Sequence, residues 1–444
     1  MFVFYGKAVS YEAAFFFCAY SLGRNCYLKK QISIRWPVTL ISMMDGIRKF
    51  LKISLLTETF PPEVNGVSFT LAHLARGLCA MGSEVEVLRP ARKTVGKDDE
   101  PWSELDFPAR PIPNYPQLRF GLPCYKLLLQ RWQEDRPDVI YLATEGPAGF
   151  SALRAAKKLG IPTVSGFHTN FDLYLKHYKI SLIKPLVDGY LKWFHNKTMA
   201  TFAPTDWMIE ELENKGYRNV RRLSRGVDRE LFSPTKRSEK LRRSWNVGEI
   251  DRVLICVSRI AAEKNLNIAC KFFQERIEQG KAKAGVIVGD GPQRERLSRE
   301  YPQLIFPGCL SKADLAEHYA SADIFVFSST TETFGNVVTE ALTSGLPVVA
   351  YDYAAPAEYI KPGRNGYLST LGNEDSLSSN LDKILRLSGL NLATMGREAR
   401  ASTKPADWKK IIGRFHRDLV EATREIPNLN LHQPSEPTCI EAHA

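Results

Sequence analysis

Short runs of apolar residues alternate with stretches in which apolar residues recur every three or four positions. This alternation runs through most of the chain and predicts parallel β-strands joined by helices, as in α/β proteins. The predicted strands cover residues 52–56, 84–88, 138–143, 162–166, 200–203, 253–258, 284–288, 304–306, 323–327 and 346–352. The predicted helices cover residues 67–81, 148–159, 206–216, 312–320, 335–345, 375–387, 391–400 and 407–424.

Three segments lack this pattern. Residues 96–120 contain five prolines and little periodicity, so a long loop or irregular insertion is predicted there. Residues 354–358 (AAPAE) follow a predicted strand and are interpreted as a loop at the edge of the sheet. The last twenty residues have three prolines and no periodicity, which is typical of a disordered tail.

The most informative stretch is 328–340 (SSTTETFGNVVTE), which joins a predicted strand to a predicted helix. Glu332 falls on the turn, and Glu340 lies about a turn and a half into the helix that starts at Gly335. Open α/β sheets bind ligands at this edge, and a helix N-terminus attracts phosphate. Two carboxylates that can accept hydroxyl groups, beside a site for a diphosphate, favour a nucleotide-sugar as the ligand.

Other candidate residues lie where predicted strands end or helices begin. Gly66 comes at the start of a helix, His168 ends a strand, and Arg259 and Lys264 lie in a strand-to-helix loop. The arginine fork and the lysine ammonium can neutralise a diphosphate, and a histidine here can transfer a proton or bind a polar group. The alternatives are a plain turn glycine, a structural histidine and ordinary surface charge.

The turn at 288–292 (VGDGP) has glycines but lacks the third glycine and the downstream acid of a dinucleotide fingerprint. An NAD-dependent enzyme is therefore only weakly supported.

Composition indicates a globular protein. A chain of 444 residues with 44% hydrophobic and 11% aromatic residues is long enough for two domains. Its eight cysteines show no CxxC or Cys/His grouping, so they are interpreted as reduced thiols of a cytoplasmic protein and not as a zinc site.

The net charge of +11 is unevenly spread, because residues 215–243 hold eleven Lys or Arg against three acidic residues. A solvated basic face, a surface for anionic membranes and a nucleic-acid site are the three alternatives. Nucleic acid is the least favoured, since no known nucleic-acid-binding pattern accompanies the charge.

No apolar run is long enough to predict a membrane-spanning helix. Residues 1–50 are interpreted as an N-terminal extension outside the core. The alternative is a membrane-surface anchor that uses the aromatic residues Phe15, Phe16, Phe17 and Tyr20.

Six motifs occur in an order that is characteristic of one enzyme family. They are TFPPEVNGV (59–67), FHTN (167–170), RGVD (225–228), SRIAAEKN (258–265), VGDGP (288–292) and ETFGNVVTEALTSGLPVVA (332–350). With these motifs, residues 51–424 resemble the retaining glycosyltransferases of family 4, most of all the bacterial GDP-mannose-dependent α-mannosyltransferases. Sulfoquinovosyldiacylglycerol synthases are similar too. Pro356 is a departure from the mannosyltransferase pattern.

The resemblance implies the α/β fold called GT-B, in which two Rossmann-like domains face a cleft and the C-terminal helix crosses back to the first domain. The implied parts are an extension (1–50), an N-terminal acceptor domain (51–228), a C-terminal nucleotide-sugar domain (229–405), a returning helix (406–426) and a disordered tail (427–444).

The resemblance also implies roles for single residues. Those implied to be catalytic are His168, Glu332, Arg259 and Lys264. Those implied to bind the donor are Gly66, Arg259, Lys264, Gly308, Leu310, Glu332, Phe334, Gly335, Asn336, Val337 and Glu340. Glu340 would bind the ribose, Glu332 the transferred sugar, and Gly308 and Leu310 the base. Neither a metal nor a cofactor is implied.

The implied activity is transfer of a hexose, with mannose from GDP-mannose first, onto a lipid or lipid-linked glycan. The protein would be cytoplasmic or peripheral on the inner face of the plasma membrane, with an anionic membrane surface as a further partner. The alternative donor is UDP-glucose, UDP-galactose or UDP-sulfoquinovose. A non-catalytic nucleotide-binding protein is the rival of a different class.

Overall fold

A computed structural model describes residues 50–63, 65–91, 100–112, 115–168 and 184–424. Most of the predicted extension (1–50), the whole predicted tail (427–444), and Thr169 and Asn170 of the FHTN motif lie outside these residues. No helix of the described part of the chain is long and apolar enough to cross a membrane.

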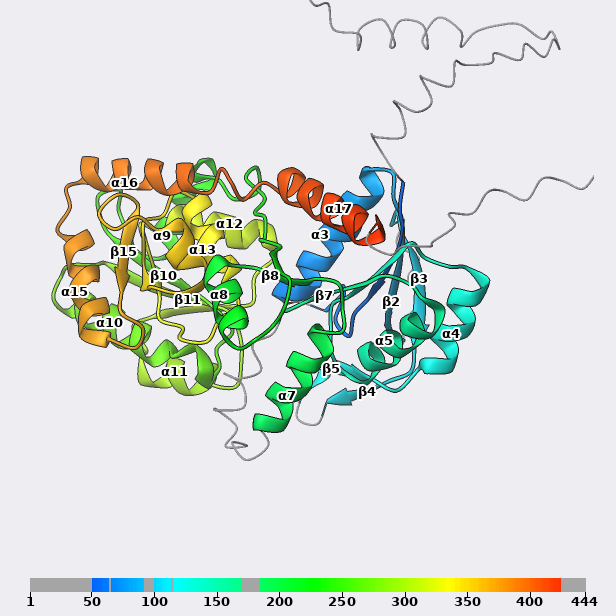
Figure 1. Cartoon of the computed structure of the whole chain (residues 1–444). Coiled ribbons are helices and arrows are strands. Elements are labelled where there is room, and N and C mark those ends of the chain that lie inside the picture. Colours follow the sequence, from blue (N-terminus) through cyan, green and yellow to red (C-terminus); the bar gives the residue numbers. More distant parts are fainter. Residues whose placement is uncertain (1–49, 64, 92–99, 113–114, 169–183, 425–444) are drawn as a thin grey trace, which may run out of the picture. The chain divides into compact units, whose positions relative to one another are not determined.

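The first sheet is parallel throughout, with the strand order β3-β2-β1-β6-β7-β8-β9 (Figure 1). Its strands are β1 (Lys52–Leu56), β2 (Glu84–Pro90), β3 (Ser103–Phe107), β6 (Val139–Leu142), β7 (Thr163–Gly166), β8 (Thr201–Ala203) and β9 (Val220–Arg222). The helices of this half are α3 (Gly66–Ala80), α4 (Tyr125–Glu134), α5 (Pro147–Leu159), α7 (Lys184–His195) and α8 (Asp206–Asn214).

The second sheet is also parallel and has the order β12-β11-β10-β13-β14-β15. Its strands are β10 (Val253–Val257), β11 (Ala284–Val288), β12 (Ile305–Gly308), β13 (Ile324–Phe327), β14 (Val348–Tyr351) and β15 (Gly366–Ser369). Its helices are η2 (Pro234–Lys236), α9 (Glu239–Ser244), η3 (Ala262–Lys264), α10 (Leu266–Glu278), α11 (Arg294–Glu300), α12 (Lys312–Ser321), α13 (Asn336–Thr343), α14 (Ala354–Tyr359), α15 (Glu374–Leu385) and α16 (Gly389–Ser402). The last helix of the described chain is α17 (Trp408–Arg424).

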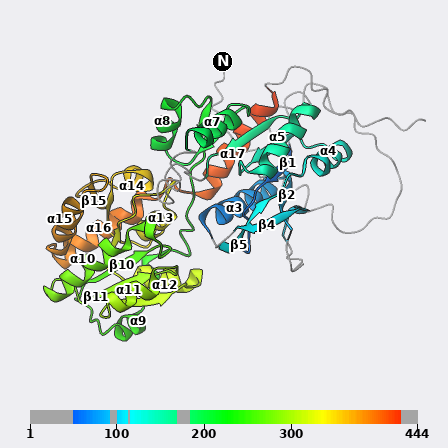
Figure 2. The same cartoon turned by 90° about the horizontal axis from the view of Figure 1, so that it is seen from below.

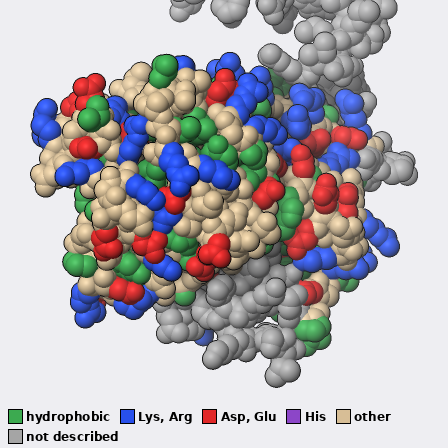
Figure 3. Space-filling model, turned by 90° about the vertical axis from the view of Figure 1, so that its left-hand side faces the viewer, with side chains coloured by type: hydrophobic (Ala, Val, Ile, Leu, Met, Phe, Trp, Pro, Cys, Tyr) green, Lys and Arg blue, Asp and Glu red, His purple; other side chains and the backbone are tan. Residues whose placement is uncertain are grey.

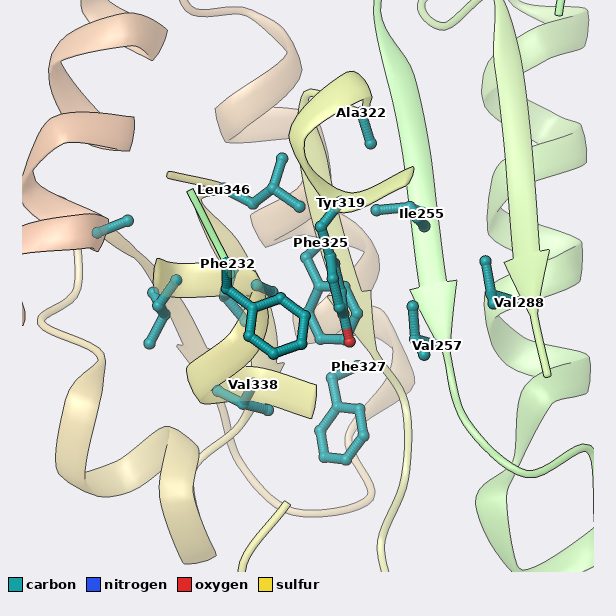
Figure 4. Close-up of a cluster of buried hydrophobic side chains, with 14 of the residues drawn as sticks. Phe232, Ile255, Val257, Val288, Tyr319, Ala322, Phe325, Phe327, Val338 and Leu346 are labelled. Carbon is teal, nitrogen blue, oxygen red and sulfur yellow. The ribbon is translucent and has the colours of Figure 1, made fainter. Parts of the chain in front are cut away.

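Both faces of each sheet are covered, so the strands are apolar on both sides, as expected for buried parallel sheets. In β10, Ile255 and Val257 point into one hydrophobic cluster, while Leu254 and Cys256 point into the cluster on the opposite face. Figure 4 shows the first of these clusters, where Ile255 lies beside the ring of Tyr319. This layering confirms the predicted α/β class.

Helix α17 packs on the first sheet although it ends the described chain. Its buried residues Ile412, Phe415, Leu419 and Ala422 join the cluster built by β1 and α3, and the two helices lie side by side in Figures 1 and 2. The predicted return of the last helix to the first domain is therefore confirmed. The boundary between residues 228 and 229 stays a prediction.

Residues 96–120 were predicted to form a long loop or an irregular insertion, and the long loop is wrong for the residues of this segment that the structure describes. The segment contains β3, β4 (Ala109–Ile112) and most of β5 (Tyr115–Gly121). Strand β3 is the edge of the first sheet, and β4 and β5 pair only with each other in a two-stranded ribbon. Edge strands tolerate proline because one row of their backbone groups needs no partner, so Pro111 and Pro116 do not prevent pairing.

The prediction of a loop over 354–358 is also wrong, since these residues form most of α14. Pro356 is the third residue of this short helix, where a missing N–H costs no internal hydrogen bond.

Candidate active site

The centre of the candidate site is an ion pair between two strand-end loops. Lys264, from the loop after β10, places its Nζ 2.6 Å from Oε1 of Glu332, which lies in the loop after β13. The same Nζ donates to the carbonyl oxygen of Thr331 at 3.1 Å. Strands β10 and β13 are neighbours, and the order of the strands reverses between them. The pair therefore occupies the point at which open α/β sheets bind ligands.

The loop that carries Arg259 is held in place by the VGDGP turn. Gly289 and Gly291 have positive φ values of 132° and 155°, and a Cβ on either would collide with the carbonyl of Ser258 or Ile260. The Ile260 N–H donates to the Asp290 carbonyl at 2.8 Å. The turn thus has a structural role as a support. Arg259 itself forms an ion pair with Glu263 of the same loop.

Helix α13 begins with two partly buried residues, Asn336 and Val337. Its N-cap Gly335 has φ of +95°, and no side chain caps the helix. Asn336 and Val337 form the first turn, and the Phe334 ring is buried beneath them in the core. An uncapped helix start leaves backbone N–H groups available to an anion, with the helix dipole favouring negative charge.

Glu340 lies one turn further along α13 and accepts a hydrogen bond from the Tyr319 hydroxyl at 3.2 Å. Burial raises the pKa of Glu340 to about 7, although the hydrogen bond from Tyr319 and the charge of Lys312 oppose this shift. A carboxyl group with a strongly shifted pKa at a sheet edge is a typical functional-site residue.

Replacing Glu340 by glutamine is expected to stabilise the protein at pH 8 but not at pH 5. The Glu340 carboxyl group binds its proton more tightly in the folded protein than in the unfolded chain. The free energy of unfolding of the wild type therefore falls as the pH rises from about 4.5 to 7. The neutral amide avoids that loss, which amounts to about 3 kcal/mol. Urea denaturation at the two pH values measures it. Glu295→Gln, on the exposed side of α11, is the control and should show no such pH dependence.

His168 follows β7 and is 7% exposed. Its Nε2 lies 2.6 Å from the Tyr141 hydroxyl, and its Nδ1 is buried with no hydrogen-bond partner among the described residues. Burial, aided by the charge of Arg225, lowers the pKa of His168 to about 3. At neutral pH the ring is therefore neutral, so it can bind a hydroxyl group but carries no positive charge.

Gly66, at the start of α3, lies close to residues of both halves of the chain. An ideal Cβ on Gly66 would lie 3.2 Å from Nη1 of Arg225 and 3.2 Å from Nδ2 of Asn336. A side chain at this position would therefore require these two neighbouring side chains to shift slightly. Asn65 caps α3 by accepting from the N–H groups of Val67 and Ser68.

Gly308 and Leu310 stand apart from these residues. Gly308 ends β12, which is the edge strand and is separated from β10 by β11. Its carbonyl accepts from Gly289 N–H at 3.0 Å, and Leu310 packs against the core. Their contact with a base stays a prediction.

Two residues of the site carry no role in the sequence-based interpretation. Tyr319 sits in the middle of a helix whose pattern shows only that it faces the core. Arg225 belongs to the basic segment 215–243, and nothing in the sequence distinguishes it from the other Lys and Arg residues of that segment. The structure buries Arg225 and Arg242, so the interpretation as a solvated face is wrong for these two. Arg222 pairs with Glu358 of the second half.

Comparisons with known proteins agree with this fold. Residues 64–231 match the family model "Glycosyltransferase Family 4", and residues 237–402 match "Glycosyl transferases group 1". The chain is 35% identical to the GDP-mannose-dependent alpha-mannosyltransferase of Mycobacterium tuberculosis, over 74% of this chain and 85% of that protein. It is 29% identical to sulfoquinovosyl transferase SQD2 of Arabidopsis thaliana, over 82% of this chain and 72% of that protein.

Among solved structures, Anabaena HepE in complex with UDP and glucose superposes with a TM-score of 0.65 at 20% identity. The match covers 83% of this chain and 99% of HepE. This similarity establishes the GT-B fold. Together with the family matches and the mannosyltransferase relative, it shows that the chain belongs to the family 4 glycosyltransferases.

Proposed function

We propose that the protein transfers mannose from GDP-mannose to a lipid or lipid-linked glycan, with retention of the anomeric configuration. The observation that carries the proposal is the Lys264–Glu332 pair beside the uncapped start of α13. This arrangement offers a cation and backbone donors to a diphosphate, and a carboxylate to sugar hydroxyls. GDP-mannose is the donor named for several relatives.

In the proposed reaction, the bond between the sugar C1 and the phosphate oxygen breaks while a C1–O bond to the acceptor forms on the same face. The acceptor proton passes to the leaving phosphate. Arg259, Lys264 and the start of α13 stabilise the charge that grows on that phosphate, and no metal ion takes part in the proposal. Neutral His168 binds a hydroxyl of the transferred sugar, and Glu340 binds the ribose.

A lipid acceptor is supported by the relatives, which include alpha-monoglucosyldiacylglycerol synthases of Streptococcus pneumoniae and Acholeplasma laidlawii. We place the enzyme at the inner face of the plasma membrane on this ground. The basic segment 215–243 gives less support, because Arg221, Arg222 and Arg237 pair with acidic side chains. On the face shown in Figure 3, basic side chains are interspersed with acidic and neutral ones.

A second candidate is a glycolipid synthase that uses a UDP-sugar. The match to a sulfoquinovosyl transferase favours it. Both donors could be bound equally well by Glu332, Lys264 and the start of α13, because these groups would contact the diphosphate and the sugar.

Donor hydrolysis by the purified protein distinguishes the two candidates. With GDP-mannose, UDP-glucose, UDP-galactose and UDP-sulfoquinovose offered separately, we expect GDP-mannose to be consumed at least about tenfold faster than the others. A tenfold preference corresponds to about 1.4 kcal/mol of differential transition-state binding. Preference for any UDP-sugar would contradict the mannose assignment and support the second candidate.

A further inference from the structure

Arg225 is a buried cation whose hydrogen-bonding groups are largely unused. It follows β9 in the RGVD motif and is 6% exposed. Its Nη1 donates a long hydrogen bond of 3.4 Å to Oδ1 of Asn336, and its guanidinium lies 5.7 Å from the centre of the Phe334 ring. Its Nε and Nη2 are buried without a hydrogen-bond partner among the described residues. A buried charge in this state is costly, so its position needs an explanation.

The surroundings of Arg225 come from both halves of the chain. Gly66 of α3 and Asn336 of α13 lie against its Nη1. The charge of Arg225 acts on His168 and Tyr141, and the charge of Glu332 favours the protonated form of Arg225. The guanidinium therefore lies among residues that the proposed function assigns to the donor.

The other two cations of the site differ from Arg225 in one respect. Lys264 forms an ion pair with Glu332, and Arg259 forms one with Glu263. Arg225 forms no such pair with any carboxylate of the described residues. Burial lowers its pKa only to about 10, so it is positively charged at neutral pH. An anion bound at this point would both use the free donors and balance the buried charge.

We propose that Arg225 binds the sugar-linked phosphate of the donor through its Nε and Nη2 groups. The inference rests on the proposed function, because it assumes a nucleotide-sugar in this site. The planar guanidinium fork matches two phosphate oxygens, and it contacts Asn336, the first residue of the uncapped helix α13. When the C1–O bond breaks, Arg225 stabilises the charge left on that phosphate.

A structural role would give different results on substitution. If Arg225 only linked Gly66 to α13 by packing, its loss would lower stability and weaken all nucleotides alike. If it binds the phosphate, replacement by methionine removes an unbalanced buried charge while keeping most of the packing on Phe334. The melting temperature Tm should then stay unchanged or rise.

The test compares nucleotide affinities of the full chain by isothermal titration calorimetry. GDP, GMP, UDP and UMP are titrated into wild type, Arg225→Met, Arg225→Lys and the control Arg221→Met, which removes the same charge from nearby β9. We expect Arg225→Met to bind the diphosphate of the preferred base about 10- to 100-fold more weakly and the monophosphate within about 2-fold of wild type. The control should bind both as wild type does.

Equal affinities of Arg225→Met and wild type for the diphosphate, or an equal loss for both nucleotides, would overturn the inference. If Arg225→Met does not fold, Arg225→Lys decides by the same ratio, since it keeps the charge and loses the fork. Failure of the wild-type protein to bind any of the four nucleotides would instead contradict the proposed function.

Discussion

Replacing Lys264 by alanine is expected to lower kcat/KM for sugar transfer by about 100- to 1000-fold. The Nζ of Lys264 lies 2.6 Å from Glu332 at the switch point of the second sheet, where the leaving phosphate is proposed to bind. Removal of one preorganised charge from such a site typically has an effect of this size. Steady-state kinetics with the preferred donor measure it.

The protein should stay folded after this change, because the side chains of Lys264 and Glu332 are 14% and 16% exposed and water can reach the carboxylate that is left. Lys271→Ala, at an exposed position of α10, is the matched control and should keep wild-type activity. The double variant Lys264→Ala/Glu332→Gln should lose little more than the single one if the pair acts as a unit. Undiminished turnover of Lys264→Ala in folded protein would refute the site.

Replacing Phe415 by alanine is expected to lower the free energy of unfolding by about 3–5 kcal/mol, as for other buried phenylalanines. Phe415 anchors α17 on the first sheet. Its ring centre lies 5.1 Å from that of Tyr141 and 5.0 Å from that of Phe202, and only 1% of it is exposed. Urea denaturation measures the loss.

Because Tyr141 holds His168 by a 2.6 Å hydrogen bond, the folded Phe415→Ala protein should also transfer sugar more slowly. Phe415→Leu, which keeps most of the volume, should cost less than about 1.5 kcal/mol. A cost below about 1 kcal/mol for Phe415→Ala would mean that α17 contributes little to the first domain, against the packing described above.

Sequence patterns predicted most of the fold because parallel strands are buried on both faces and are continuous apolar runs. Strands such as β10 and β13, with the turn residues after them, place Lys264 and Glu332 at the same sheet edge. Their contact therefore follows from topology. What the patterns missed has a physical cause as well. Edge strands need not be apolar and can contain proline. Strands β4 and β5 were therefore missed, because they lie in a segment whose proline content predicts a loop.

The site was predictable where the chemistry is local in the chain and unpredictable where it is not. The sequence alone shows that Glu332 lies on a turn and that Glu340 lies on the helix that follows it. By contrast, the charge density of residues 215–243 does not distinguish Arg225, which is buried, from Arg221, which pairs with Glu421 of α17. Burial of a single arginine depends on contacts with α3 and α13, more than 100 residues away in either direction.

The most direct test of the proposed function is the anomeric configuration of the first product. Carbon-13-labelled GDP-α-mannose, wild-type protein and membrane lipids are combined, and the one-bond coupling at C1 of the lipid product is measured by NMR. The proposed function predicts a mannosyl lipid with the α configuration, formed by wild type and not by Lys264→Ala. A β-linked product, or none from any nucleotide-sugar donor, would contradict it.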